Sequence, residues 1–361
     1  MDLKTPLYDC HVAAKGKIVS FAGYLLPVQY EAGVIAEHMA VRQKVGMFDV
    51  SHMAEMTLCG KDAMKNVQML VTNECGNMTD GQVKYSTMCY ENGTTVDDLL
   101  VYKIDDEHIL LVVNAANHLK DVEWIKSHLT GDVVFEDISD NVAQIALQGP
   151  KALEVMRKVS DESKLPTKYY TFVPRCTVAG KTCLVSRTGY TGEFGYEIYC
   201  APGDVADIWN ALLENGKEEG LLPCGLGCRD TLRFEAGMPL YGHEMDDTIT
   251  PIEASLGFCV KMKKPDFIGK KALEERGAVT RKVCTLKITG KGIAREHQDV
   301  YADGRKIGTT CSGTHCPYLG GAFATALLDL PYNEVGTKVE IDVRGRRVAA
   351  EVVKTPIYDR A

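Results

Sequence analysis

Apolar and polar positions along the first third of the chain alternate between short strand-like runs and longer amphipathic segments. Three segments place their apolar residues at helical spacing, at 34–44, 61–70 and 118–128. Three strand-like runs, at 85–90, 99–104 and 108–113, are joined by turns at 91–93 and 105–107. This order predicts an antiparallel meander with flanking helices.

The rest of the chain continues with short elements. After residue 141 the pattern predicts strands at 144–148, 176–178, 182–187 and 196–200, and helices at 151–159 and 205–215. Beyond residue 282 it predicts almost only strands, at 283–288, 305–311, 322–328, 339–343 and 347–353. We therefore predict an α+β fold with antiparallel sheets and a C-terminal all-β barrel or sandwich. A nucleotide-binding doubly wound domain is disfavoured, because the chain lacks regular strand-helix-strand alternation and a Gly-x-Gly-x-x-Gly segment.

Two adjacent carboxylates, Asp97 and Asp98, stand at the head of one predicted strand. Strand neighbours point to opposite faces, and both faces of this run are apolar beyond the acids. At least one carboxylate should therefore face a low-dielectric interior or a cleft wall, where it needs donors, a cation or a chemical role. Alternation alone does not say which one, and an acid at a hairpin edge after the turn at 91–93 is the plain alternative.

A glycine-containing segment at 188–198 carries a second acid in an apolar setting, Glu197. The plain interpretation is a hairpin whose glycines supply positive φ, and the functional one is a backbone that approaches a planar ligand. A fixed carboxylate there could accept two parallel hydrogen bonds from an amino-pyrimidine edge. Farther along, Arg229 and Arg233 lie four apart on a predicted helix that ends at Gly237, where they could hold a carboxylate or a buried glutamate, or form a surface stripe with nearby acids.

Asp49, Ser51 and His52 fall within four positions and could in principle form a serine-histidine-aspartate site. Sequence neighbours seldom supply that geometry, so a helix-exit loop with internal hydrogen bonds is favoured. An acidic metal site for hydrolysis, built from Asp97, Asp98, residues 105–106 and His108, stays open as a separate class of function.

Composition narrows these possibilities. The formal net charge is −8 and no run is rich in lysine or arginine, which argues against nucleic acid as the main partner. The thirteen cysteines are scattered, mostly in apolar stretches and without metal-ligand spacing, so we expect free thiols in a reducing compartment and no structural metal. No leader-like N-terminus and no membrane-length apolar run is present, and we expect a soluble cytoplasmic protein.

Six motifs resemble, in order and spacing, the aminomethyltransferase, or T-protein, family of the glycine cleavage system. They span nearly the whole chain and are Thr5-Pro6-Leu7-Tyr8, Phe48-Asp49-Val50-Ser51-His52-Met53, Asp97-Asp98-Leu99, Leu147-Gln148-Gly149-Pro150, Gly189-Tyr190-Thr191-Gly192-Glu193 and the run from Arg229 to Gly237. The resemblance implies a three-domain cloverleaf. Residues 1–50 and 141–240 would form a discontinuous folate-binding domain, 51–140 an inserted meander, and 241–361 a linker and a C-terminal all-β domain.

The same resemblance implies the site and the reaction. Asp98 matches the family's functional aspartate, Glu197 its pterin-binding glutamate and Arg229 its motif arginine. The folate-binding set then comprises Met53, Tyr85, Asp97, Asn114, Tyr190, Glu197, Arg229 and, where the match thins, Arg360. The implied reaction transfers a one-carbon unit from the lipoyl arm of the H-protein to tetrahydrofolate and releases ammonia, with no metal. A related folate-dependent demethylase or a non-catalytic folate-binding protein is the alternative.

Overall fold

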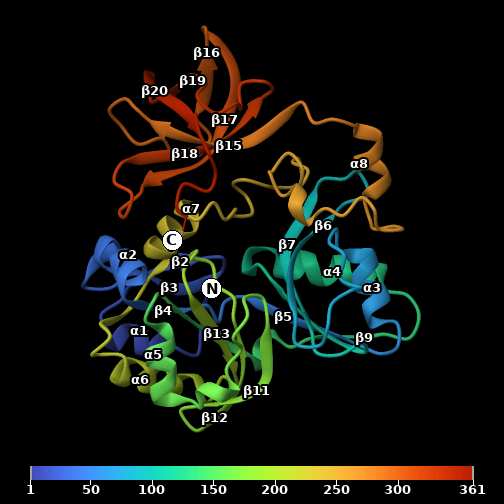
Figure 1. The fold of residues 1–361 in the computed structure, drawn as a ribbon, viewed down its shortest axis with the longest axis vertical. Helices are drawn as coiled ribbons and strands as arrows, with labels where there is room; N and C mark the ends of the chain where they lie inside the picture. The colour runs from blue at the N-terminus through green and yellow to red at the C-terminus, as the bar shows by residue number, and fades with distance from the viewer. Residues whose placement is uncertain (1, 360–361) are drawn as a thin grey trace. The chain divides into compact units, whose positions relative to one another are not determined.

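The computed structural model describes residues 2–359 (Figure 1), and the chain divides into two compact units. Unit 1 contains the chain up to Val67, residues 75–85 and residues 99–230. Unit 2 contains residues 68–74, residues 86–98 and the chain from Thr231 onward. Asp97 and Asp98 thus belong to unit 2, whereas Glu197 and Arg229 belong to unit 1. The three domain boundaries expected from the sequence stay a prediction.

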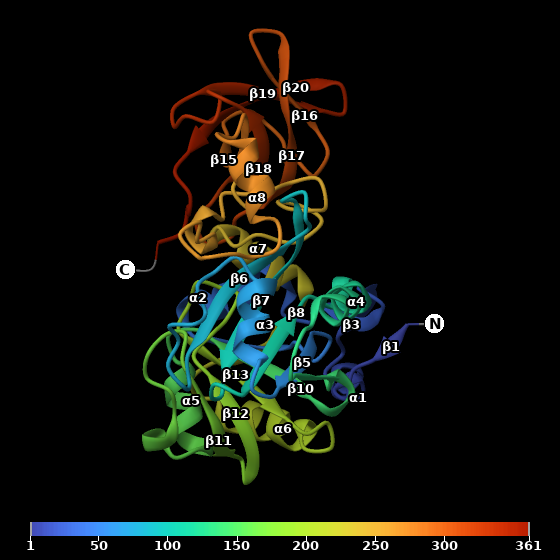
Figure 2. The same cartoon turned by 90° about the vertical axis from the view of Figure 1, so that its right-hand side faces the viewer.

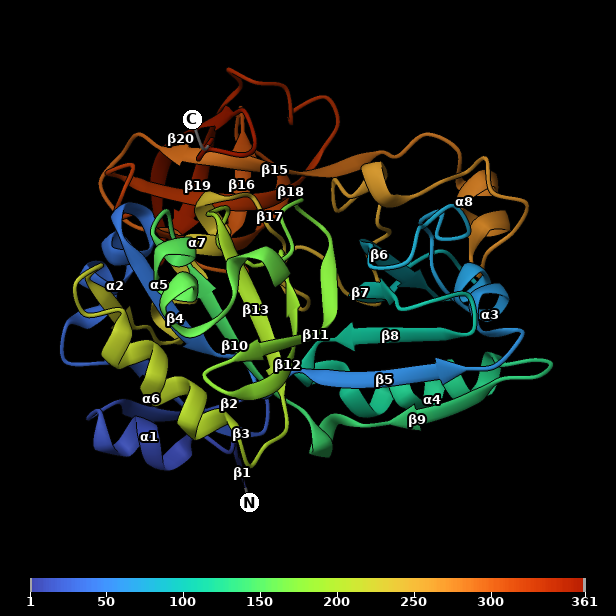
Figure 3. The same ribbon diagram turned by 60° about the horizontal axis from the view of Figure 1, so that its bottom comes forward.

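Unit 1 is built on a six-stranded sheet in the order β11-β12-β13-β10-β4-β14. Its strands are β4 (Val45–Asp49), β10 (Ala143–Gln148), β11 (Phe172–Val178), β12 (Lys181–Ser186), β13 (Gly195–Cys200) and β14 (Leu221–Pro223). Helices α5 (Ala152–Val159) and α6 (Val205–Asn215) lie along one face of this sheet (Figure 3). All but β4 and β14 lie where the sequence pattern places elements, within a few residues at each end.

The two faces of this sheet differ in chemistry. Ile145 pairs with Ile198, and both side chains point into an apolar core that also contains Val185 and Trp209. The alternate positions point to the other face, where Gln144 pairs with Tyr199 and Ala146 with Glu197. These polar side chains are nevertheless buried. The second face is therefore a polar layer inside unit 1, which is unusual enough to indicate a site.

A five-stranded sheet in the order β6-β7-β8-β5-β9 includes the predicted meander. Its strands are β5 (Ala54–Cys59), β6 (Val83–Cys89), β7 (Thr95–Lys103), β8 (His108–Val113) and β9 (Val134–Asp137), with helices α3 (Ala63–Leu70) and α4 (His118–His128). The predicted helices and the three predicted strands are confirmed. Within unit 1, Glu55 pairs with Val112 and Leu100 pairs with Val112, so all three share one face. Tyr102 of that face meets Tyr199 of the polar layer, with ring centroids 5.8 Å apart.

The N-terminal segment adds a small sheet to unit 1 in the order β1-β3-β2. Its elements are β1 (Leu3–Lys4), α1 (Tyr8–Ala13), β2 (Lys17–Phe21), β3 (Tyr24–Gln29) and α2 (Gly33–Gln43), the last confirming the predicted first helix. Short 3-10 helices occur at η1 (Ala115–Asn117), η2 (Ser139–Asn141), η3 (Glu162–Lys164) and η4 (Gly257–Cys259).

Unit 2 ends in a closed six-stranded barrel (Figure 2). Its strands are β15 (Arg281–Ile288), β16 (Asp299–Ala302), β17 (Arg305–His315), β18 (Ala322–Asp329), β19 (Lys338–Val343) and β20 (Arg346–Val353), preceded by α7 (Leu226–Glu235) and α8 (Lys270–Arg276). The barrel confirms one of the two predicted architectures. Helix α7 begins in unit 1 and its last half belongs to unit 2, and Gly237 follows it with a φ of +68°, the left-handed geometry that ends many helices.

Candidate functional site

Glu197 is the central acid of the polar layer in unit 1. Glu197 is 7% exposed, and the Thr188 hydroxyl donates a hydrogen bond to its Oε2. Burial raises the pKa of Glu197, while the Thr188 hydrogen bond and the positive charge of Arg229 act in the opposite direction. A carboxylate can accept about four hydrogen bonds, so Glu197 keeps acceptor capacity for a ligand.

A chain of hydroxyls holds Thr188 in place. Ser186 and Thr188 lie within hydrogen-bond distance at 2.8 Å, and the Tyr102 hydroxyl lies 3.3 Å from each of them. Tyr102 also meets the Tyr199 hydroxyl at 2.8 Å. All these side chains are buried, so the network fixes the direction from which Thr188 reaches Glu197.

Arg229 and Tyr190 supply a cation and an aromatic face in unit 1. The Arg229 guanidinium carbon lies 4.7 Å from the centroid of the Tyr190 ring, within the range of a cation-π contact. The charge of Arg229 also lowers the pKa of His52, although burial is the larger cause and brings that pKa to about 4. The structure thus brings together three residues singled out in the sequence, Glu197, Arg229 and Tyr190, and their chemistry fits a planar heterocycle that carries N–H donors.

Three other predicted folate-binding residues, Met53, Tyr85 and Asn114, also lie in unit 1. Met53 packs at the edge of the apolar cluster that contains Tyr102 and Tyr199, next to the polar layer. Tyr85 lies on β6 and Asn114 directly precedes η1, and both side chains are half-buried. Arg360 lies outside the described residues.

Asp97 and Asp98 differ in exposure. Asp97 is fully buried, which confirms that at least one acid of the pair faces an interior, and Asp98 is half-buried. Within unit 2, burial raises the pKa of Tyr241, and the charges of Tyr90 and Asp97 add to the effect. Asp98 is therefore the carboxylate of the pair with access to solvent or substrate, and its chemical role stays a prediction.

The segment at 46–53 does not form a serine-histidine-aspartate site. Asp49 instead accepts hydrogen bonds from Thr5 at 2.6 Å and from the Ser51 backbone at 2.9 Å, and lies 2.9 Å from His11. The Tyr30 hydroxyl lies 2.9 Å from the other ring nitrogen of His11. Burial alone would raise the pKa of Asp49, but the His11 contact keeps it below its ordinary value. This buried network ties the N-terminal segment to β4.

Arg233 holds a buried glutamate, which was one of the alternatives for the arginine pair. Its Nη1 lies 3.0 Å from Glu244 Oε2 and its Nη2 donates to Ser312 Oγ at 3.0 Å. Arg233 is 2% exposed and Glu244 is 3% exposed. The pair lies inside unit 2 and fixes the end of α7 to the barrel, so the surface-stripe interpretation is wrong for Arg233.

Glu55 is a polar residue of unit 1 that sequence reasoning missed. It is 1% exposed, and neither of its carboxyl oxygens has a hydrogen-bond partner among the described residues. Burial, followed by the charges of Asp137 and Glu197, raises the pKa of Glu55 well above its ordinary value. The run Ala54-Glu55-Met56-Thr57 alternates in the way of a half-exposed strand, so the only available signal pointed to solvent.

Glu55→Gln is expected to stabilise the protein at neutral pH. The folded state keeps a proton on Glu55 that the unfolded chain releases above about pH 4.5, so wild-type stability falls as pH rises between the two pKa values. Glutamine does not titrate, so the unfolding free energy of Glu55→Gln should exceed that of the wild type by about 1.4 kcal/mol more for each pH unit within that window. Urea unfolding of both proteins at about pH 6 and about pH 8 measures the difference. If the difference in unfolding free energy between Glu55→Gln and the wild type is the same at both pH values, Glu55 is not protonated in the folded state.

Two features expected of other classes of function are absent from the described residues. Within residues 2–359 no group of three or more His, Cys, Asp or Glu side chains is arranged to hold a metal ion. No helix in this part of the chain is long and apolar enough to cross a membrane. No disulfide joins any two of the thirteen cysteines, all of which lie within residues 2–359.

Comparison with known proteins gives concordant matches. Residues 7–264 match the family described as GCVT N-terminal domain, and residues 281–359 match the glycine cleavage T-protein C-terminal barrel domain. An aminomethyltransferase of Geobacillus sp. (strain WCH70) is 48% identical over 361 residues, with 99% of each chain covered. One from Halalkalibacterium halodurans is 48% identical over 360 residues, covering 99% of this chain and 98% of its own. The crystal structure of the glycine cleavage system aminomethyltransferase T of Bartonella henselae superposes with a TM-score of 0.91 at 28% identity, covering 99% and 98% of the two chains.

Proposed function

Because this chain belongs to the glycine cleavage T-protein family and is a folate-dependent aminomethyltransferase, we propose that it takes the aminomethyl group from the lipoyl arm of the H-protein. In the proposed reaction two nitrogens of tetrahydrofolate attack the methylene carbon of the S-aminomethyl group in turn, so that two carbon–nitrogen bonds form while the bonds to the amine and to the lipoyl sulfur break. Ammonia and the dihydrolipoyl H-protein leave, and 5,10-methylenetetrahydrofolate forms. This reaction asks the protein to orient the folate nitrogen, exclude water and stabilise developing positive charge.

The observation that carries the proposal is the buried carboxyl of Glu197 beside a guanidinium. Its burial, its Thr188 partner and the nearby charge of Arg229 are what a pterin ring would need from a recognition site. We propose that Glu197 accepts hydrogen bonds from the amino-pyrimidine edge and that Tyr190 and Met53 line the ring. Tyr85, Asn114 and Asp97 complete the proposed folate-binding set, and Arg360 is the weakest member.

Asp98 is the proposed working acid of the reaction. A half-buried carboxylate can be approached by a reacting group, so it can stabilise positive charge that develops at the methylene carbon and the leaving amine. It can also accept and return a proton at its carboxylate oxygens. The fully buried Asp97 is less suited to either task because a reacting group cannot approach it as easily.

We propose that the H-protein is the protein partner and that the chain works in the cytoplasm. Most of the thirteen cysteines are buried like small core residues, which supports a reducing compartment.

Glu197→Ala and Arg229→Ala are each expected to weaken tetrahydrofolate binding by about 2–4 kcal/mol, or roughly 30- to 900-fold, because a buried polar partner is left unpaired. Titration calorimetry measures the effect. Arg157→Ala is a matched control in unit 1, since Arg157 is half-exposed and pairs with Glu162 on the surface. Unchanged affinity in both site variants, with circular dichroism like that of the wild type, would reject this pocket.

A further inference from the structure

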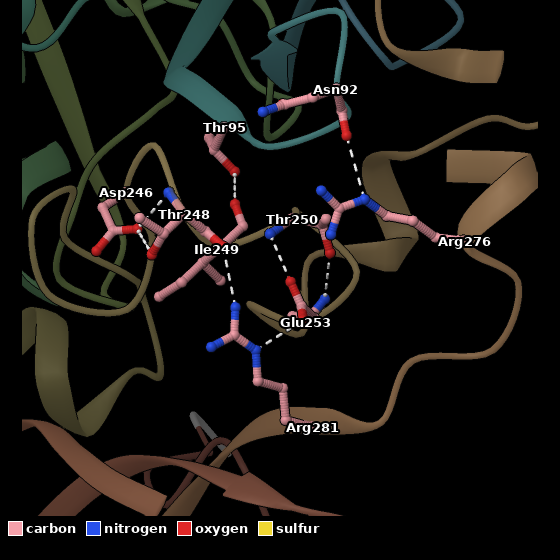
Figure 4. Close-up of polar contacts among 9 residues, drawn as sticks. All are labelled: Asn92, Thr95, Asp246, Thr248, Ile249, Thr250, Glu253, Arg276 and Arg281. Atoms are coloured by element: carbon pink, nitrogen blue, oxygen red, sulfur yellow. Dashed lines mark hydrogen bonds and ion pairs between the residues drawn. The ribbon is translucent and has the colours of Figure 1, made fainter. Parts of the chain in front are cut away.

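The first residue of β7, Thr95, is bound by a loop of unit 2 (Figure 4). Both its backbone N–H, at 3.0 Å, and its hydroxyl, at 2.8 Å, donate to the Ile249 carbonyl. The Tyr241 hydroxyl donates to the Thr95 carbonyl at 3.3 Å. All three polar groups of Thr95 are therefore used by residues 241–249, far along the chain.

The ion pair between Arg281 and Glu253 contacts the backbone on both sides of Ile249. Arg281 donates through Nη2 to the carbonyl of Thr248 at 2.9 Å and through Nε to Glu253 Oε1 at 2.8 Å. The other oxygen of Glu253 accepts the backbone N–H of Thr250 at 2.8 Å. The peptide groups before and after Ile249 are thus held by one carboxylate and one guanidinium (Figure 4). We call Thr95, Thr248, Ile249, Thr250, Glu253 and Arg281 the Ile249 brace.

Backbone contacts anchor the Ile249 brace to the barrel strand β15. The Val283 N–H donates to the Glu253 carbonyl at 2.7 Å, and the Ser255 hydroxyl donates to the Val283 carbonyl at 2.7 Å. The loop also closes on itself, since the hydroxyl and the N–H of Thr248 both lie 2.7 Å from Asp246 Oδ1. The Ile249 carbonyl therefore has a fixed position relative to β15 within unit 2.

Strand β7 is hydrogen-bonded to β6 in the sheet, and its head additionally contacts this brace because it precedes the ladder with β8. The ladder between β7 and β8 begins at Leu99 and runs to Lys103, so Thr95 to Asp98 precede it. Asp98 follows Thr95 by three residues on an extended strand, a distance of about 10 Å at 3.3 Å per residue. We expect a displacement of Thr95 to displace Asp98 as well, because only three residues of extended strand separate them.

We infer that Arg281 and Glu253 are positioning residues that hold the Ile249 carbonyl against Thr95 and thereby set the place of the Asp98 carboxylate. The inference rests on the proposed function, in which Asp98 supports the transfer reaction. Neither residue needs to touch substrate. The Arg281 side chain is 36% exposed and that of Glu253 is 9% exposed, so water screens the pair on the Arg281 side and its loss should cost less stability than loss of the buried Arg233–Glu244 pair.

Arg281→Gln is expected to lower kcat about tenfold while the KM for tetrahydrofolate stays within about twofold, because a displaced reacting group costs rate more than binding. Glu253→Ala should behave in the same way. Glu253→Gln keeps an acceptor oxygen for only one of its two donors, the Thr250 N–H or the Arg281 Nε–H, so its loss of kcat should be smaller than that of Glu253→Ala. Lys306→Ala is the control, since its half-exposed ion pair with Asp299 joins only two barrel strands.

Two further measurements separate positioning from a general structural effect. In an Asp98→Asn background, Arg281→Gln should cause little additional loss of kcat, because both changes act through one carboxylate. Hydrogen exchange of the peptide that covers residues 93–98 should be faster in Arg281→Gln than in Lys306→Ala. This measurement does not depend on transfer activity.

Unchanged exchange at residues 93–98, a normal kcat, or the same fold-loss with and without Asp98 would each overturn the inference. A wild-type protein without transfer activity would instead defeat the proposed function, and the exchange measurement would still decide the brace. An active wild type with a normal Arg281→Gln variant would defeat the brace alone.

Discussion

Asp98→Asn is expected to reduce turnover by about 10²–10³ while tetrahydrofolate affinity changes little. The substitution keeps the shape of the side chain and removes its charge, and loss of one preorganised electrostatic partner costs a rate factor of this size. Asp98 is half-buried, so the neutral amide should leave the melting temperature close to that of the wild type. Steady-state ammonia release, folate titration and thermal melts on the same preparation measure the three quantities.

Asp97→Asn is the matched comparison, one residue away on the same strand. Because Asp97 is fully buried, we expect its replacement to reduce turnover much less than that of Asp98. If Asp97→Asn is the crippled variant, or if Asp98→Asn turns over normally, the assignment of the working acid is wrong.

Arg233→Met is expected to destabilise unit 2 by about 3–5 kcal/mol, because it leaves the buried carboxylate of Glu244 without its cation. Thr325 at 2.6 Å and the Leu240 N–H at 2.9 Å remain as donors to Glu244, but they do not replace the charge. Burial would raise the pKa of Glu244, yet Arg233 keeps it below its ordinary value. The wild type should therefore lose this contribution as pH falls through the lowered pKa, whereas at neutral pH it is fully present.

Urea unfolding followed by a probe in the barrel measures the Arg233 effect, since a chain of two units need not unfold in one step. The double variant Arg233→Met with Glu244→Leu removes both charges and should recover much of the lost stability. Arg295→Ala, which removes an exposed contact to the Gly313 carbonyl on the same barrel strand as Ser312, is the control. An Arg233→Met protein as stable as the control would contradict the role given to this pair.

The sequence pattern predicted elements with strong periodicity and missed those without it. Helices α4 and α6 occur at the predicted residues because their apolar side chains recur at helical spacing over three turns. The pattern does not predict strand β16, because Asp299-Val300-Tyr301-Ala302 shows no alternation of polar and apolar residues. Whether the C-terminal strands form a barrel or a sandwich was left open by the pattern, because closure depends on pairing between β15 and β20, at opposite ends of this segment.

For the candidate site too, the sequence pattern predicts local features and not contacts between distant residues. Glu197 was found because an acid between apolar strand residues is anomalous in any sequence, and its burial on the polar layer followed. The partner of Asp49 was not found, because His11 lies 38 residues away and only the fold brings the two together. Choosing Asp98 over Asp97 required the family resemblance, since alternation separates two faces without saying which one a substrate meets.

Ammonia release from aminomethylated H-protein, measured with and without tetrahydrofolate, tests the central claim most directly. We expect rapid release only when tetrahydrofolate is present, with one 5,10-methylenetetrahydrofolate formed for each ammonia. Folate binding without any acceleration of ammonia release would contradict the proposed transfer and leave a folate-binding protein in its place.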